Sequence, residues 1–492
     1  MIRLLRRLLW LVFSLALLSV LVVVGHLLHV WWKDPAGPPA WPEAGRGDVG
    51  RFVAGKPSEV IQVAGNLVEA EAQLSALVLR AGSTGGHIAI AGRRHCMGGH
   101  TMADGAMVLD MTPLKHVKVD AANKTITVGA GAVWENILLE LQKHQLAVKV
   151  MQSNNDFSIG GSLSVNCHGW QQGLPPVSST VRSFRLVTAD GKVVECRRDN
   201  ENAVLFRHVL GGYGLFGIVT EATLDVVDDA YYTLKSVPVT PATYHQEFMR
   251  MTADNEVGMA YGRINVAPFG FLETGTVNVL RKTSGSGIPK LTPTGPLETL
   301  KRLVFRGSVG SAFGKQIREW GEGIGGETTG GWRSIIQSEP AAKFGSYDTG
   351  SSEILHEYFV PVAQLEAFVK AIRPLLKDKK YPVDLLNITV RDVKPDTDTA
   401  LPYAREHVFG LVMLFHLELG QESDLNMQAF TQRMIDAALK VGGTYYLPYR
   451  LHASPEQFKA AYPQAAAFFA EKHRVDPKGI FTNTFHQTYD RK

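Results

Sequence analysis

The chain has 492 residues, of which 45% are hydrophobic and 20% charged, so it can bury large cores in two or three structural units. Its 51 Lys and Arg against 47 Asp and Glu leave a formal charge of +4, too small and too evenly spread for a nucleic-acid surface. Three cysteines, Cys96, Cys167 and Cys196, are too few for a disulfide framework and lack the spacing of a metal site. The composition thus excludes nucleic acid as a partner and indicates an ordinary globular protein in bulk.

The first element is an almost uninterrupted apolar run from Leu8 to Trp32, about the length of a helix that spans a hydrocarbon core. Three arginines lie within the first seven residues, whereas only Lys33 closely follows the run, so the positive-inside bias predicts a cytoplasmic N-terminus. The run is long for a signal peptide and no A-x-A-like site follows it, which favours an uncleaved anchor over a cleaved signal peptide. We therefore predict a single-pass protein of the inner (cytoplasmic) membrane, with its catalytic part on the periplasmic, extracytoplasmic side.

After this run, the residues from Pro35 to Pro42 are rich in proline and predict a stiff spacer. The chain then alternates short apolar strands with amphipathic helices, expected at Glu69–Arg80 and from Val133 to about His144, which is an α+β rhythm. Beyond Asp229, long alternating segments replace the glycine-rich turns and indicate a second domain. The stretch Gly321–Gly331 is too polar to pack a core, and it is read equally well as a solvated linker or as an active-site lid.

Three glycine clusters lie in the first half of the chain, at residues 91–99, 158–169 and 211–217. Glycines at the end of a strand let backbone N–H groups surround a phosphate without a Cβ in the way, and two such loops suggest a pyrophosphate. Turn geometry alone is the alternative for any one cluster. The third cluster matches G-x-G-x-x-G but runs into a β-rich segment, whereas a nicotinamide site joins a strand to a helix, so we set a Rossmann site aside.

Four segments, taken in order, resemble the successive FAD-contacting segments of the vanillyl-alcohol oxidase/p-cresol methylhydroxylase (PCMH) superfamily. They are Gly92–Gly99, Val128–Ala132, Ile159–Gly169 and Gly211–Val219. The match is closest to the alditol oxidase, aldonolactone oxidase and decaprenylphosphoryl-ribose oxidase branches. It covers roughly Val53 to Val227, and Val475–Asn483 resembles the closing segment of the family.

The resemblance implies an α+β fold, in which a PCMH-type FAD-binding domain of two α+β subdomains meets an α+β cap domain that holds the substrate. One N-terminal transmembrane helix precedes them. The predicted divisions are an anchor at 1–33, a proline-rich linker at 34–52, the FAD-binding domain at 53–229, the cap at 230–455, and a C-terminal segment at 456–492 that returns to the FAD domain.

The resemblance also implies FAD bound through a covalent bond, because His95 aligns with the histidine that many members bond to the flavin 8α-methyl carbon. Here Arg94 precedes it in place of the usual glycine, and His100 is the alternative attachment point. Two metal ligands are the other reading of this pair, but no acid or cysteine stands at a helpful spacing. The residues implied to contact FAD are Ala91, Gly92, Arg93, Arg94, His95, Cys96, Gly98, Gly99, Ser158, Ile159, Gly160, Gly161, Ser162, Asn166, His168, Gly217, Ile218, Val219 and Asn483.

Hydride loss from a carbon beside a hydroxyl group needs a base or a polarising group for the hydroxyl proton. In Leu386–Arg391, alternation places Thr389 and Arg391 on one strand face, and the alditol-oxidase pattern implies an acid where Thr389 stands. His416 and Glu418 share a face of a neighbouring strand, as a base oriented by a carboxylate or, equally, as a buried structural pair.

Other catalytic candidates come from two further segments. Tyr445–Arg450 resembles a segment that bears a catalytic lysine in related oxidases, and here Tyr449 or Arg450 takes its place. His168 matches a histidine near the flavin of sugar-oxidising relatives, with a structural role as the alternative. The predicted catalytic residues are His416, Glu418, Arg391, Tyr449, Arg450 and His168.

Together these features predict an FAD-dependent oxidoreductase that oxidises a CH–OH group of an alcohol, lactol or sugar-like small molecule. Hydride would pass to flavin N5, and electrons onward to oxygen or to a membrane acceptor such as a quinone. Oxidation of a lipid-linked or hydrophobic substrate drawn from the membrane is the first alternative. A flavin-bearing membrane subunit without catalytic activity is the second.

Overall fold

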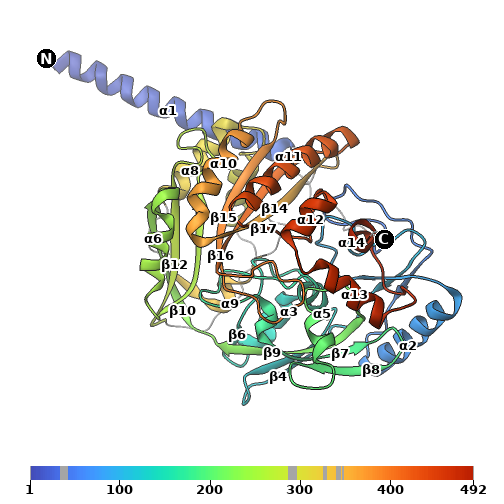
Figure 1. The fold of residues 1–492 in the computed structure, drawn as a ribbon. Helices are drawn as coiled ribbons and strands as arrows, with labels where there is room; N and C mark the ends of the chain where they lie inside the picture. The colour runs from blue at the N-terminus through green and yellow to red at the C-terminus, as the bar shows by residue number, and fades with distance from the viewer. Residues whose placement is uncertain are drawn as a thin grey trace.

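The computed structural model describes residues 2–33, 43–285, 296–324, 330–339, 345 and 348–490. Its N-terminal helix α1 (Ile2–Lys33) projects from the folded body, as Figure 1 shows in blue. The part from Leu5 to Lys33 is long and apolar enough to cross a membrane, a property that it shares with signal sequences. The apolar run predicted as a helix is thus confirmed as one.

A three-stranded parallel sheet, ordered β1–β3–β2, forms the smaller half of the first domain. Its elements are β1 (Glu59–Gln62), α2 (Leu67–Thr84), β2 (Ile88–Ala91) and β3 (Met107–Asp110). Helix α2 begins where the Asn66 side chain accepts hydrogen bonds from two backbone N–H groups, and it ends at Gly85 in the left-handed conformation. Its apolar face, with Leu74 and Val78 fully buried, packs on this sheet, which confirms the helix predicted at 69–80.

A second sheet completes this domain, with the strand order β4–β5–β9–β7–β8 and with β6 paired to β9. The strands are β4 (Val117–Asp120), β5 (Thr125–Gly129), β6 (Leu146–Val148), β7 (Val181–Val187), β8 (Val193–Arg197) and β9 (Ile218–Asp228). The helices are α3 (Trp134–Gln142), α4 (Ile159–Ser164), the 3-10 turn η1 (Val177–Thr180) and α5 (Ala203–Val209). The buried Trp134 indole donates a hydrogen bond of 2.9 Å to Ser162 Oγ, which fixes the second glycine cluster to the domain core.

An eight-stranded sheet forms the second domain, in the order β13–β10–β12–β11–β15–β16–β14–β17. Its strands are β10 (Tyr231–Val239), β11 (Val257–Ile264), β12 (Gly275–Thr283), β13 (Gly330–Trp332), β14 (Ser351–Pro361), β15 (Asp384–Val393), β16 (Val408–Glu418) and β17 (Thr444–Tyr445). Helices α6 (Pro241–Thr252), α10 (Leu365–Leu376) and α11 (Gln421–Lys440) pack on it, and the 3-10 turn η3 (Val362–Gln364) precedes α10. Figure 1 shows this sheet standing against the first domain, with the three helices on its outer side.

Between β12 and β14, the described residues form three helices, namely α7 (Pro296–Arg306), α8 (Ala312–Ile324) and α9 (Arg333–Ile336). The linker or lid predicted at Gly321–Gly331 is wrong at both ends, because residues 321–324 continue α8 and Gly330 begins β13; residues 325–329 lie outside the described part. Helical context overrides the low intrinsic helix propensity of glycine at Gly321.

The linker predicted at 34–52 is also wrong in its second half, whereas residues 34–42 lie outside the described part. Asp48 is fully buried, and its carboxylate accepts hydrogen bonds from the backbone N–H groups of Gly50 (3.0 Å) and Gly99 (2.9 Å). Burial raises the pKa of Asp48 to about 6. Residues 43–52 therefore belong to the packed domain, tied to its first glycine loop.

The chain finally returns to the first domain through α12 (Pro455–Ala461), α13 (Ala465–Val475) and α14 (Thr484–Tyr489). Backbone hydrogen bonds join Ile88 to Ile480 (2.7 Å) and to Thr482 (2.9 Å), so this segment lies alongside β2. Asn483 donates a side-chain hydrogen bond of 2.8 Å to the carbonyl of Tyr213 in the third glycine cluster. The C-terminal residues thus complete the domain that carries the glycine loops.

Candidate functional site

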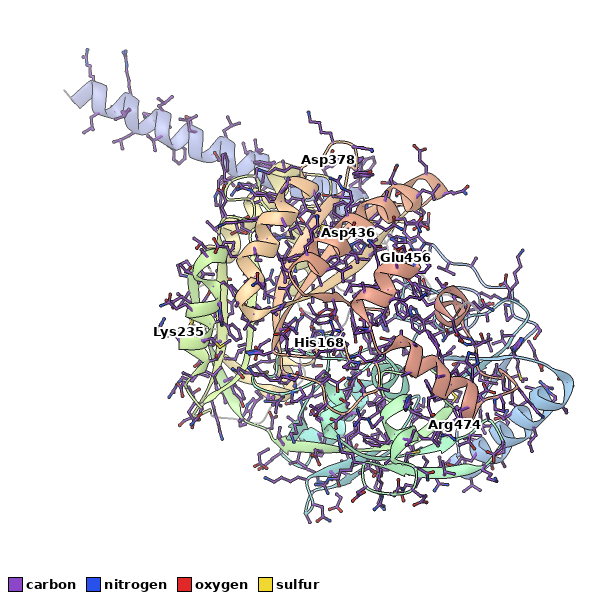
Figure 2. The ribbon with its side chains drawn as sticks, viewed as in Figure 1. His168, Lys235, Asp378, Asp436, Glu456 and Arg474 are labelled. Carbon is purple, nitrogen blue, oxygen red and sulfur yellow. The ribbon has the colours of Figure 1, made fainter. Side chains whose placement is uncertain are left out.

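A cavity of about 1570 Å³ lies between the glycine loops of the first domain and the inner face of the eight-stranded sheet. It exceeds the usual size of a small-molecule pocket, so there is room for a dinucleotide and a substrate together. Figure 2 labels His168 between the strands of the eight-stranded sheet and the first domain. The cavity brings together residues of all three glycine clusters and of six strands of the eight-stranded sheet.

The first two glycine clusters meet at Gly92 and Ser158. A Cβ added at Gly92 would lie 2.2 Å from Ser158 Oγ, so the loops approach this closely only because residue 92 has no side chain. Ser158 Oγ in turn accepts a hydrogen bond from the N–H of Arg93 (3.3 Å). Arg94 adopts φ 58°, and among the described residues its buried Nε has no hydrogen-bond partner. The Arg94 Nη1 donates a hydrogen bond of 3.0 Å to the Gly92 carbonyl oxygen. A glycine loop beside a guanidinium with one buried N–H still to be paired fits the pyrophosphate of FAD.

His95 lines the same cavity and is held in one orientation. Its ring stacks on Phe157 with centroids 3.7 Å apart and planes 8° apart, and Nε2 lies 3.2 Å from the carbonyl oxygen of Asp156. Burial lowers the pKa of His95 to about 4, and the nearby carboxylate of Asp156 opposes this shift only in part. The imidazole is therefore neutral at pH 7, the form that acts as a nucleophile.

His100, the alternative attachment point, has a different environment. Its ring packs among aromatic side chains, with centroids 5.7 Å from Tyr213 and 5.8 Å from Phe485. Burial lowers its pKa to about 4 as well. Both histidines line the cavity and lie on the same loop between β2 and β3, with His95 nearer to the contact of Gly92 with Ser158.

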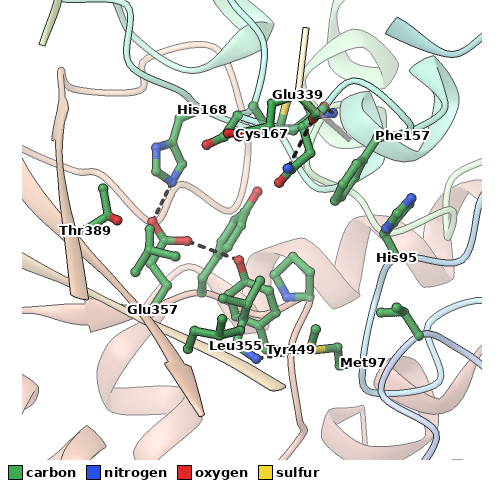
Figure 3. Close-up of a pocket in the computed structure, with 18 of the residues that line it drawn as sticks. His95, Met97, Phe157, Cys167, His168, Glu339, Leu355, Glu357, Thr389 and Tyr449 are labelled. Atoms are coloured by element: carbon green, nitrogen blue, oxygen red, sulfur yellow. Dashed lines mark hydrogen bonds and ion pairs between the residues drawn. The ribbon is translucent and has the colours of Figure 1, made fainter. Parts of the chain in front are cut away.

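A polar cluster projects into the cavity from the eight-stranded sheet and from the second glycine cluster, as Figure 3 shows. Glu357 on β14 is 3% exposed, and its carboxylate lies 2.7 Å from His168 Nε2 and 3.5 Å from the hydroxyl of Tyr449. Among the described residues, the buried Nδ1 of His168 has no hydrogen-bond partner. Such a buried carboxylate and imidazole can hold a proton between them.

Arg391 supplies a positive charge beside this pair. Its guanidinium lies 5.2 Å above the ring of Trp170 and donates a hydrogen bond to Ser153 Oγ. Within the described part of the chain, its buried Nε and Nη1 have no hydrogen-bond partner. Burial lowers the pKa of Arg391 to about 10, while Glu357 acts in the opposite direction. Unsatisfied donors in a cavity wall are what an anionic or oxygen-rich ligand would satisfy.

Glu357 was missed by the sequence analysis, which looked for an acid at Thr389. In the sheet, Thr389 and Glu357 both lie opposite Val412, one on each side of β16. Thr389, Val412 and Glu357 therefore lie side by side across three neighbouring strands. The carboxylate of Glu357 is two strands away from the position of Thr389, where an acid was expected. A signal was present, since Glu353, Leu355 and Glu357 alternate along one face of an otherwise apolar strand.

His416 and Glu418 are not part of this cluster, and their predicted place at the reaction centre is corrected. Neither lines the large cavity; both line a shallow pocket beside the start of α8. His416 Nδ1 lies 2.9 Å from Glu353, whereas the Glu418 side chain is 77% exposed. On β16 the inward positions at the cavity are taken by Val412 and Leu414, so the strand passes the cavity edge before it reaches His416.

Arg450 also points elsewhere than predicted. It pairs with Asp424 at 2.5 Å and donates a hydrogen bond of 3.2 Å to the carbonyl of Met97. It therefore ties the first glycine loop to helix α11, without lining the cavity. Tyr449, Arg391 and His168 do line it, so the structure brings three of the six predicted catalytic residues together.

The residues predicted to contact FAD divide into two groups. Those that line the cavity are Gly92, Arg93, Arg94, His95, Cys96, Ser158, Gly160, Gly161, His168, Gly217 and Val219. Those outside its lining are Ala91, Gly98, Gly99, Ile159, Ser162, Asn166, Ile218 and Asn483. Members of the second group hold the loops, as Asn166 does by donating a hydrogen bond of 2.9 Å to Asp396. Their predicted contact with the cofactor stays a prediction.

Two family models match this chain, one in each of the two domains that line the cavity. A family model described as FAD binding domain matches residues 66–197, and one described as D-arabinono-1,4-lactone oxidase matches residues 332–489. Decaprenylphosphoryl-beta-D-ribose oxidase of Mycolicibacterium smegmatis is 23% identical over 433 residues, which cover 82% of this chain and 90% of that protein.

Two plant relatives match shorter parts. Cytokinin dehydrogenase 7 of Oryza sativa subsp. japonica is 28% identical over 228 residues, covering 44% of this chain and 42% of that protein. Mitochondrial L-galactono-1,4-lactone dehydrogenase 2 of the same plant is 34% identical over 114 residues, covering 23% of this chain and 19% of that protein.

The buried, neutral His95 makes the stability of the flavin-free protein depend on pH. Its pKa is about 4 in the folded protein, against an ordinary 6.5, so the unfolded chain binds the extra proton between these values. The free energy of unfolding is therefore lost as pH falls from about 6.5 towards 4. Between pH 7 and pH 5 this group should account for a loss of about 2 kcal/mol in urea unfolding. An equal loss in His95→Gln would contradict this assignment.

The contact between the two glycine loops can be tested by adding and then relieving a clash. We expect Gly92→Ala to reduce the flavin content of the purified protein strongly, because its Cβ would meet Ser158 Oγ at 2.2 Å. Adding Ser158→Ala removes that oxygen and leaves the nearest Ser158 atom at 3.3 Å, so the double variant should regain part of the flavin. Flavin content is measured by absorbance. Full occupancy in Gly92→Ala would show that the loops need not meet.

Proposed function

We propose, since this chain belongs to the PCMH-type superfamily of FAD-dependent oxidoreductases, that it oxidises a CH–OH group of an alcohol, lactol or sugar-like substrate. The observation that carries the proposal is the buried cluster of Glu357, His168 and Arg391, which faces the cavity beside the FAD-binding loops. Bound FAD supplies the acceptor at N5 for the hydride that leaves the substrate carbon.

In the proposed mechanism, Glu357 accepts the proton of the substrate hydroxyl. His168 lies 2.7 Å from this carboxylate, so it orients the carboxylate and shares the proton. Arg391 has two buried donors without partners among the described residues, and these are placed to polarise the substrate oxygen. An arginine keeps its charge in such a site, so it serves as a positioning and polarising group and not as the base.

The surroundings of the cluster favour this chemistry because they exclude water. The His168 ring has its centroid 5.4 Å from Phe359, 5.7 Å from Tyr403 and 5.8 Å from Tyr446. All three aromatic side chains are buried. Charge interactions are stronger in such a low-dielectric setting than in water. These ordered polar groups also argue against the reading of a flavin-bearing subunit without catalytic activity.

We further propose that α1 anchors the protein in the inner (cytoplasmic) membrane, with the catalytic part on the periplasmic side. Supporting observations are the length and apolarity of Leu5–Lys33 and the three arginines before it. An anchored enzyme lies beside the quinone pool, so a membrane acceptor competes with oxygen for the electrons. A Trp pair at the end of the helix, Trp31 and Trp32, suits the bilayer interface.

A lipid-linked substrate is a second candidate, supported by basic side chains in the cavity lining. At the end near α1, the cavity is lined by Lys301 and Arg302 from α7 and by Arg318 from α8. Positive side chains there would suit the phosphate group of an anionic, membrane-embedded sugar donor. Reduction of the bound flavin by soluble polyols, compared with isoprenoid-phosphate-linked sugars, distinguishes the two candidates.

The proposed bond between His95 and the flavin has a direct test. We expect the wild-type polypeptide to remain yellow after acid denaturation and washing, because a covalent flavin cannot be extracted. His95→Ala should release its flavin, and His100→Ala should retain it. Release from the wild type would exclude a covalent bond, and retention in His95→Ala would move the bond to another residue.

The role of Glu357 separates the observed cluster from the pair predicted from the sequence. We expect Glu357→Gln to slow reduction of the flavin by an active substrate by roughly 100-fold to 10,000-fold, the usual contribution of a general base. Glu418→Gln, a matched change at an exposed carboxylate outside the cavity, should leave the rate unchanged. Stopped-flow absorbance of the flavin measures both. The reverse pattern would restore the sequence-based assignment.

A further inference from the structure

The C-terminal turns of helix α1 are docked on the protein. With 32 residues and a rise of about 1.5 Å per residue, the helix spans about 48 Å, whereas a hydrocarbon core measures about 30 Å. The described side chains of residues 2–22 are exposed, but from Val23 onward one side of the helix is partly covered.

The covered side has the spacing of a packing face. Val23, His26, Leu27 and Val30 are partly buried, while Leu28 and His29 between them are exposed. Separations of three, four and seven residues place the four covered side chains on one stripe of the helix. The last turns of α1 are therefore packed as a surface helix of a globular domain is packed.

His26 makes the specific contacts of this stripe. Its Nε2 donates a hydrogen bond of 2.8 Å to the carbonyl oxygen of Gly307, just after α7. Its ring meets Phe313 of α8 edge to face, with centroids 5.7 Å apart. A Cβ added at Gly314 would lie 1.8 Å from the Gly307 carbonyl oxygen and 3.0 Å from His26 Nε2. The three segments meet this closely only because residue 314 is glycine.

The hairpin formed by α7 and α8 is the roof of the cavity at this end. Leu300, Arg302, Val304 and Phe305 from α7 and Arg318 from α8 line it. Two buried arginines attach the hairpin to the sheet below. Arg306 pairs with Glu353 at 2.6 Å, and Arg318 donates a hydrogen bond to the carbonyl of Leu386. The hairpin is thus held by the sheet on one side and by α1 on the other.

We propose that the turns of α1 from Val23 onward are a structural part of the cap, and that they hold the α7–α8 hairpin over the cavity, with His26 as the positioning residue. The membrane segment then does more than retain the enzyme at the bilayer, because it also sets how firmly the roof of the cavity is closed. This inference rests on the proposed function only in taking the cavity as the substrate site.

Hydrogen exchange of the full-length, flavin-loaded protein in lipid nanodiscs tests the contact directly. In His26→Ala we expect the amides of α7 and α8 to exchange about fivefold faster, because a hydrogen bond contributes on the order of 1 kcal/mol. His29→Ala is the matched control, since it changes the same residue type on the exposed side of the same helix. Equal exchange in the two variants would overturn the proposal.

A second pair of variants keeps the test independent of His26. Phe313→Ala removes the ring of α8 that His26 meets edge to face, whereas Trp320→Ala removes an exposed ring of the same helix. Without docking, neither change would reach α1. We expect Phe313→Ala to speed amide exchange in α1 from Val23 onward as well as in α8, with Trp320→Ala leaving α1 unchanged. Unchanged exchange of α1 in Phe313→Ala would overturn the proposal.

The outcome is separable from that of the proposed function. Exchange of α7 and α8 is measured without a substrate, so it stands even if Glu357→Gln retains full activity. Conversely, loss of activity in Glu357→Gln says nothing about α1. Flavin content and the exchange of α2, which lies in the first domain, report whether each variant is folded. A variant whose amides exchange faster in α2 as well is unfolded in part, and the other pair of variants then tests the proposal.

Discussion

The close approach of Gly92 to Ser158 is the constraint on which the site depends. It brings two loops from different parts of the first domain together, because residue 92 carries no Cβ that would meet Ser158 Oγ. His95 follows on one loop and His168 on the other, so this one contact places the proposed tether and the proposed catalytic pair relative to each other. The eight-stranded sheet then places Glu357 and Arg391 on the opposite wall of the cavity, facing His168. The contact of Gly92 with Ser158 thus positions both the proposed phosphate-binding loops and the proposed reaction centre.

Much of the first domain could be predicted from the sequence, because its signals are local. Asn66 and Gly85 mark the ends of α2, and the three glycine clusters of the sequence all contribute residues to one cavity. His95 could be singled out by its position after Gly92. The conformation of Gly321 could not be predicted in the same way, since the helix before it continues through a residue whose own preference is against helix.

The cap was harder to predict, because the positions of its site residues depend on the register between neighbouring strands. Alternation along β16 correctly put His416 and Glu418 on one face, but only the pairing of strands shows that the cavity ends at Leu414. Likewise, nothing local to Glu357 shows that it lies in the same row as Thr389, two strands away. Arg450 follows Tyr449 directly, yet the chain turns it towards Asp424 and away from the cavity. Long-range pairing decides each of these placements.

The return of the C-terminal segment to β2 has a consequence for biogenesis. Residues 480–483 hydrogen-bond to Ile88 and to Tyr213, so the domain that holds FAD is incomplete until these residues, late in the chain, have been made. Cofactor loading during translation is therefore disfavoured, because the glycine loops are made early but the segment that closes them is made after the whole cap. In the proposed membrane orientation, this order allows translocation to finish in an unfolded, flavin-free state before the domain closes.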